Sequence, residues 1–197
     1  MIISALVAAP MVLVSPAAPG VETAPPRALE SKADEALRLT RVMAEDLLKA
    51  EKAVIAKFKT LPEADDIRIH FAKNMYGWSV SDKCLANRRE EMDAALASYQ
   101  KEFKDTALVD ELRLFAKKVA KNSQDNLPLY EGRLAKAQKE LKEGKAPDKD
   151  GKLVDLTEYD RKTREGLLRI LPLEVEYQQE ARRIAVAYAA ALTKLMD

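Results

Sequence analysis

The stretch from Thr157 to the C-terminus constrains the fold more than any other part of the chain. Thr157 and Asp160 have the spacing of a helix start, in which a hydroxyl caps free amides and a carboxylate follows in the first turn. Beyond them, apolar or small residues recur at alternating steps of three and four, interrupted only by Glu174; they are Leu167, Ile170, Tyr177, Ala181, Ile184, Tyr188, Ala191 and Leu195. This pattern predicts one long helix with a coiled-coil-like seam along its partners.

The length of this helix predicts the shape of the molecule. A helix of about 40 residues would be about 60 Å long, whereas a compact domain of ~180 residues has a radius of gyration near 16 Å. We therefore expect an all-α protein, an elongated antiparallel helical bundle, unless Pro172 kinks the C-terminal helix enough to fold it back. The composition agrees, because 33% charged residues, 6% aromatic residues and only six Gly are typical of helical rods.

Two helices are expected before residue 80. Ser31 and Asp34 have the spacing of a helix start, and the apolar stripe that follows ends before Pro62; it consists of Leu37, Met43, Leu47, Ala50, Val54, Phe58 and Leu61. A short second helix should follow, with Ile67, Phe71 and Met75 on its stripe. Gly77 is expected to end it, as a C-terminal cap.

Further helices are expected between residue 80 and the C-terminal helix. Ser81 would cap a third helix, but its apolar stripe shifts phase midway, so residues 80–123 form either one helix with a stutter or two helices. The polar residues 122–126 predict a turn, and Pro128 predicts the start of a fourth helix antiparallel to the third. Residues 144–155 are expected to form a polar loop, and no strand is predicted anywhere.

Residues 1–17 have the character of a signal peptide, since an apolar run is followed by Ser15, Pro16 and Ala17. Cleavage after Ala17 would leave a Pro-rich leader at 18–28 and a helical bundle domain at 29–197. No Lys or Arg precedes the apolar run, and a membrane anchor is the alternative. The run is, however, shorter than the ~20 residues that a membrane span needs. We expect an exported protein, periplasmic or secreted.

The charges exclude one class of partner. The chain has 33 Lys and Arg against 32 Asp and Glu, and both signs are interleaved along the predicted helices. Nucleic-acid binding requires a basic face, which this pattern does not provide. Weak association with a membrane surface remains an alternative, through the apolar N-terminus.

Cys84 is the only cysteine, so an intramolecular disulfide is impossible, although two chains could form a Cys84–Cys84 homodimer. The thiol lies near the predicted start of a helix and beside Lys83, two features that lower a thiol pKa. A catalytic thiol also needs a base, for which His70 is the only candidate. We expect Cys84 to be structural.

The metal-ligating residues are few. His70 is the only histidine, and the chain lacks both Glu-x-x-His and Cys-x-x-Cys-His, which excludes diiron bundles, zinc hydrolases and c-type cytochromes. His70, Met75 and Cys84, with Met92 beside them, are the candidate ligands of a soft copper site, because imidazole, thioether and thiolate suit Cu(I). The alternative is that these side chains only fill the core, and no metal or cofactor is predicted.

A second metal motif is incomplete. The stretch from Asp148 to Leu153 resembles the middle of a calcium-binding loop, but Ala146 and Thr157 occupy the first and twelfth ligand positions. Because a carboxylate is required at the twelfth position, we interpret the stretch as a solvated Asp-Gly turn.

The irregular segment before the third helix contains Tyr76 and Trp78, the latter the only tryptophan. Aromatic residues in loops can anchor a partner, so both are candidate partner-contact residues; alternatively, Trp78 plugs the end of the bundle. No catalytic residue is predicted. The sequence favours an exported, non-enzymatic helical module that binds a protein or peptide partner in the cell envelope. The alternatives are a bundle that binds a small ligand or soft metal, and a helical protein associated with a membrane surface.

Overall fold

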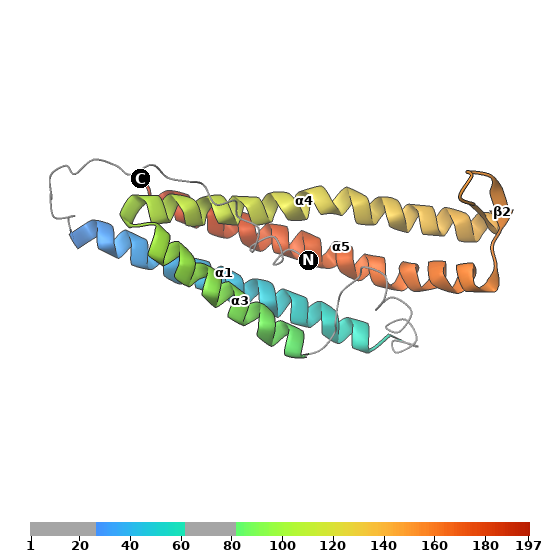
Figure 1. Cartoon of the computed structure of the whole chain (residues 1–197), viewed down its shortest axis with the longest axis horizontal. Coiled ribbons are helices and arrows are strands. Elements are labelled where there is room, and N and C mark those ends of the chain that lie inside the picture. Colours follow the sequence, from blue (N-terminus) through green and yellow to red (C-terminus); the bar gives the residue numbers. More distant parts are fainter. Residues whose placement is uncertain (1–26, 62–81) are drawn as a thin grey trace.

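The computed structural model describes residues 27–61 and 82–197, and the side chains of residues 32–61 and 89–197. Within these ranges the chain forms four helices and one two-stranded hairpin (Figure 1): α1 (Arg27–Lys59), α3 (Asp82–Glu102), α4 (Asp105–Glu143), β1 (Lys145–Pro147), β2 (Leu153–Asp155) and α5 (Glu158–Lys194). The helices pack against one another, so the predicted all-α helical bundle is confirmed. The predicted signal peptide, the predicted cleavage site and the short second helix lie outside the described residues.

Helix α5 begins where the sequence predicts. Thr157 is its N-cap: the backbone N–H of Asp160 donates to Thr157 Oγ1 at 3.1 Å, and the N–H of Thr157 donates to Asp160 Oδ2 at 3.3 Å. Pro172 lies exposed inside the helix, which continues to Lys194 without folding back (Figure 1). An exposed proline is tolerated because the face that packs on the other helices is left intact.

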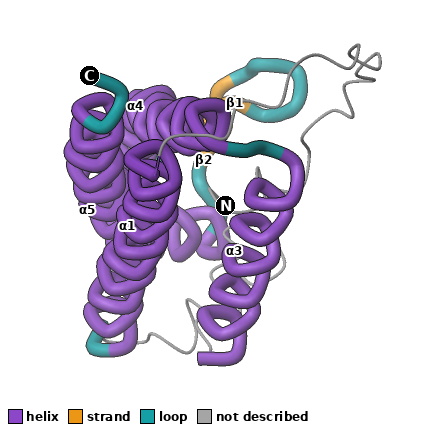
Figure 2. Tube along the Cα trace, turned by 90° about the vertical axis from the view of Figure 1, so that its left-hand side faces the viewer, coloured by secondary structure: helices purple, strands orange, loops and turns teal. Residues whose placement is uncertain are grey.

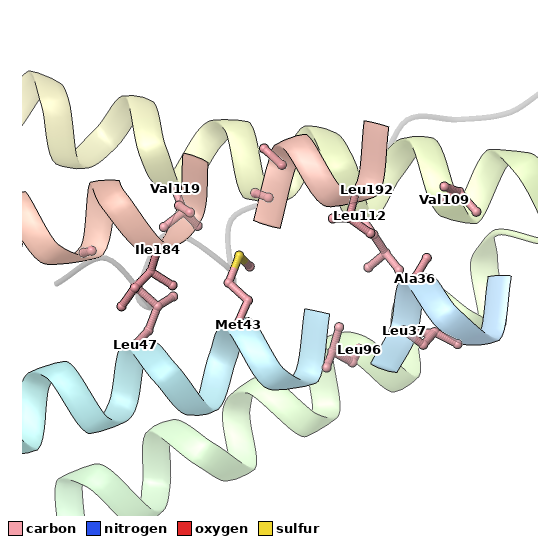
Figure 3. Close-up of a cluster of buried hydrophobic side chains, with 14 of the residues drawn as sticks. Ala36, Leu37, Met43, Leu47, Leu96, Val109, Leu112, Val119, Ile184 and Leu192 are labelled. Atoms are coloured by element: carbon pink, nitrogen blue, oxygen red, sulfur yellow. The ribbon is translucent and has the colours of Figure 1, made fainter. Parts of the chain in front are cut away.

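One apolar core joins α1, α4 and α5. Figure 3 shows Met43 and Leu47 of α1 directed toward the same interior as Leu112, Val119, Ile184 and Leu192. On α5 the buried face follows the predicted stripe at Ile170, Tyr177, Ala181 and Ile184, and then also takes in Ala185, Ala189 and Leu192. The buried face is wider than a two-helix seam because α5 packs against both α1 and α4.

Helix α3 lies on the opposite side of α1 from α5 (Figure 2). Met92 packs against Ala44 and Leu48 of α1, and Leu96 joins the main core. The structure answers the open question about residues 80–123, because α3 ends at Glu102 and α4 begins at Asp105. Asp105 has a φ of +49°, in the left-handed region that Asp tolerates better than most residues, and the chain changes direction there.

Two predicted boundaries are wrong. The first helix does not begin at Ser31, as predicted, but at Arg27, because the good helix formers Ala28 and Leu29 extend α1 upstream. The predicted turn at 122–126 does not form, and α4 runs through Pro128 to Glu143.

The helix survives Pro128 because residues on both sides of it pack inward. Val119 precedes it and Ala137 follows it, and both are almost fully buried. A proline inside a helix costs about 3 kcal/mol, which continuous packing of α4 on α5 offsets. The predicted antiparallel pairing of a third and a fourth helix at this turn is therefore wrong; the antiparallel neighbour of α4 is α5 (Figure 1).

The prediction that no strand forms is also wrong. Gly144 ends α4 with a φ of +66°, and β1 and β2 then pair in antiparallel register, with Lys145 opposite Asp155 and Pro147 opposite Leu153. Strands of three residues are too short to show the two-residue periodicity from which strands are predicted.

Candidate interaction surface

Helices α4 and α5 extend beyond the end of α1 (Figure 1). Lys57, in the last turn of α1, forms an ion pair with Glu176, which marks where α1 ends along α5. From there to its start at Glu158, α5 continues beside α4 for roughly 25 Å at 1.5 Å per residue. We call residues 124–175 the arm.

A charged network fixes the two helices of the arm near its end. Arg164 Nε donates to Glu140 Oε2 at 2.9 Å, and Arg164 Nη1 donates to Asp160 Oδ1 at 3.1 Å. The Glu140 side chain is only 9% exposed and also lies 3.7 Å from Lys136 Nζ. Charge-assisted hydrogen bonds are the stronger kind, and this network joins α4 to the first turns of α5 directly behind the hairpin.

Asp148 orders the turn between β1 and β2. Its Oδ1 accepts hydrogen bonds from the backbone N–H of Asp150 at 2.9 Å and of Lys152 at 3.0 Å. Gly151 has a φ of +80°, which suits glycine, and its N–H donates to the carbonyl of Asp148 at 3.0 Å. The stretch that resembles part of a calcium loop thus forms the predicted Asp-Gly turn. Among the residues whose side chains the structure describes, 32–61 and 89–197, no three His, Cys, Asp or Glu come together as a possible metal site.

The end of the arm exposes apolar side chains. We call residues 145–160 the tip; within it Leu153 is 59% exposed, Val154 41% and Tyr159 64%. These are three of the seven exposed large apolar side chains in the described chain, and the other four are spread over Leu114, Leu129, Val186 and Met196. A concentration of exposed apolar side chains at the end of a projecting element indicates an interaction surface.

The tip carries both signs of charge. The hydroxyl of Thr157 donates to Asp160 at 2.6 Å and holds the pKa of that carboxyl below its usual value, with Arg164 adding to the effect. On the hairpin, Lys145 Nζ lies 3.9 Å from the carboxylate of Asp155. The tip therefore has no single-sign field that would attract a polyanion.

A second feature is a set of buried polar residues in the interior. Glu51 of α1, Ser123 of α4, and Glu174 and Gln178 of α5 are all buried polar residues. Ser123 Oγ and Gln178 Oε1 have no hydrogen-bond partner in the structure. A buried polar atom without a partner reduces the free energy of unfolding, so Ser123 and Gln178 are weak points of the core.

The structure bears on few of the site residues that the sequence singles out. His70, Met75, Tyr76 and Trp78 lie outside the described residues, as does the side chain of Cys84, whose backbone is in α3. Both the soft-metal site and the aromatic partner contact therefore stay predictions. Met92, named with the copper candidates, is buried between α3 and α1.

None of the tip residues that expose apolar side chains is predicted from the sequence as a contact residue. Leu153 and Val154 are adjacent apolar residues inside an otherwise polar connection, and Tyr159 is in the first turn of α5. The apolar pair within the loop is the one signal that could have indicated a short strand there.

Comparison of the chain with protein-family models, with curated proteins and with solved structures gives no match. A search of the described helices finds none long and apolar enough to cross a membrane.

Proposed function

We propose that the protein is an exported, non-enzymatic interaction module that binds a protein or peptide partner in the cell envelope through the tip of its arm. The observation that supports this best is the exposure of Leu153, Val154 and Tyr159 at the end of the arm. Exposed apolar area on a preformed surface supports binding, because it is removed from water without a large ordering cost.

Two further observations support the proposal. The tip is held in one conformation by the Asp148 turn and by the Arg164–Glu140 network, so binding would not have to order it. The apolar run followed by Ser15, Pro16 and Ala17 supports export.

In-cell photo-crosslinking tests the proposal directly. A photoreactive amino acid is placed at position 150, an exposed site in the turn of the tip, or, as a control, at position 129 on the outside of α4, where Leu129 is 60% exposed. We expect a discrete crosslinked species from position 150, absent from position 129, in the envelope fraction.

A matched pair of triple variants then tests the role of the apolar side chains. Leu153→Ser, Val154→Thr and Tyr159→Ser removes the exposed apolar residues of the tip. The control, Leu114→Ser, Leu129→Ser and Val186→Thr, removes three exposed apolar residues elsewhere. Loss of the crosslinked partner in the first variant alone supports the proposal; equal crosslinking by both variants contradicts it.

Localisation is tested separately. N-terminal sequencing of natively expressed protein should return a chain that begins near Ala18. A chain that retains Met1 would contradict cleavage after Ala17.

A further inference from the structure

We propose that an extended segment of the partner protein pairs with the outer edge of β2 as a third strand. In this segment an apolar residue would lie opposite Leu153, and a basic residue two positions away would lie opposite Asp155. This inference rests on the proposed function, in that the partner is a protein. It adds the chemistry by which the tip recognises that partner.

The backbone N–H and C=O groups of successive β2 residues point alternately toward β1 and away from it. The N–H of Asp148 donates to the carbonyl of Lys152, and the N–H of Leu156 donates to the carbonyl of Gly144, at 2.9 Å each. Residues 148 and 152 are thus one hydrogen-bonded pair, and residues 144 and 156 are another. Because hydrogen-bonded pairs alternate with non-bonded pairs in an antiparallel ladder, Ala146 and Val154 form the hydrogen-bonded pair midway between them. The N–H and C=O groups of Leu153 and Asp155 therefore point away from β1.

The two edges of the hairpin differ. On β1 the outward groups belong to Lys145 and Pro147, and a proline has no N–H to donate. On β2, Leu153 and Asp155 each offer one donor and one acceptor. An added strand can therefore complete its ladder only beside β2, giving the order β1–β2–partner.

The side chains on this edge define the partner's chemistry. Leu153 and Asp155 lie on the same face of the strand, because side chains alternate along it. Leu153 is 59% exposed and the side chain of Asp155 is 89% exposed, 3.9 Å from its nearest cation, Lys145 Nζ. Directly opposite them, a partner strand gains most from an apolar residue and a basic residue two positions apart.

This arrangement matches strand addition as a mode of peptide recognition. Main-chain hydrogen bonds supply affinity, and alternate side chains supply specificity. Ala146 is buried on the other face of the hairpin, whereas Leu153 and Asp155 are both exposed, so their face is the more open one for a partner.

Amide hydrogen exchange on the full chain tests the proposal. The probes are acetylated eight-residue peptides rich in Thr that carry Val and Lys two residues apart, in both orders. Saturating peptide should slow exchange of the Leu153 and Asp155 amides at least about threefold and leave the Val154 amide, already bonded to β1, unchanged. If neither order slows these two amides, the proposal is overturned.

Two variants separate backbone pairing from side-chain contact. Asp155→Pro removes one outward N–H and should weaken peptide binding about tenfold or more. Asp155→Ala keeps that N–H, so binding should persist while the roughly two- to fivefold preference for Lys over Glu in the peptide disappears. Exchange of the Val154 amide reports whether the hairpin remains folded in each variant. Equal binding by parent and Asp155→Pro would overturn strand addition.

Failure of strand addition can be told apart from failure of the proposed function. If the photo-crosslinked partner still binds Asp155→Pro but not the tip triple variant, the tip is the binding surface and only strand addition is wrong. If the tip triple variant binds the partner normally, the proposed function itself fails.

Discussion

Replacing Ser123 by alanine is expected to stabilise the protein. Ser123 has no exposed surface, and its hydroxyl oxygen has no hydrogen-bond partner. Removing a buried polar group that lacks a partner gains about 1 kcal/mol or more. Alanine also exceeds serine in helix propensity by about 0.5 kcal/mol. Against these gains, a void of roughly 15 Å³ left by the oxygen costs about 0.4 kcal/mol.

The net gain in the free energy of unfolding is therefore about 1 kcal/mol, which raises the melting temperature of a chain of this size by about 2–4 °C. Differential scanning calorimetry of the purified protein measures this shift. Ser98→Ala is the matched control, because Ser98 lies exposed in α3 and gains only the difference in helix propensity, worth about 1–2 °C.

The comparison of these two variants isolates the hydroxyl. If Ser123→Ala melts below the parent, or no higher than Ser98→Ala, then Ser123 Oγ makes a stabilising interaction. That result would refute a destabilising role for the buried hydroxyl.

Three further perturbations test the core, the arm and the cap. Leu112→Asp should unfold the bundle, as measured by circular-dichroism melting, because it places a charge at a fully buried site. Leu114→Asp, at a 45% exposed site of the same helix, should leave the melting temperature nearly unchanged, and equal melting of the two variants would contradict the assigned core. Arg164→Ala should cost about 1–3 kcal/mol in urea unfolding and speed hydrogen exchange of the arm, because Glu140 stays buried without its closest cation; unchanged exchange would contradict this. Because folding lowers the pKa of Asp160, its carboxylate stabilises the protein above its unfolded pKa, near 3.9, and this stability is lost as the pH falls through the lower native pKa. The melting temperature of Asp160→Asn should therefore fall less steeply with decreasing pH than that of the parent; an equally steep fall would refute the contribution of the cap.

Signals that act within one helical turn determined much of the fold from the sequence alone. The capping box of Thr157 and Asp160 sets the start of α5 with hydrogen bonds between residues three apart, so no distant contact is needed. The stripes that contain Met43 and Ile184 predict the buried faces of two helices, because helical periodicity decides which side chains share a face.

Tertiary packing decided where local signals conflict. Pro128 and the polar residues before it favour a turn, yet α4 continues, because an unbroken helix buries both Val119 and Ala137 against its neighbours. Whether α3 and α4 are one helix was likewise open in the sequence, because the phase shift near Asp105 fits both outcomes.

The candidate interaction surface depends on tertiary structure most of all. Strands of three residues carry little signal of their own; β1 and β2 are brought into register by the antiparallel helices that they connect. The sequence could indicate that Leu153 and Val154 are apolar, but their exposure depends on how far α4 and α5 extend beyond α1. That extension follows from the relative lengths and packing of three helices, and no local pattern encodes it.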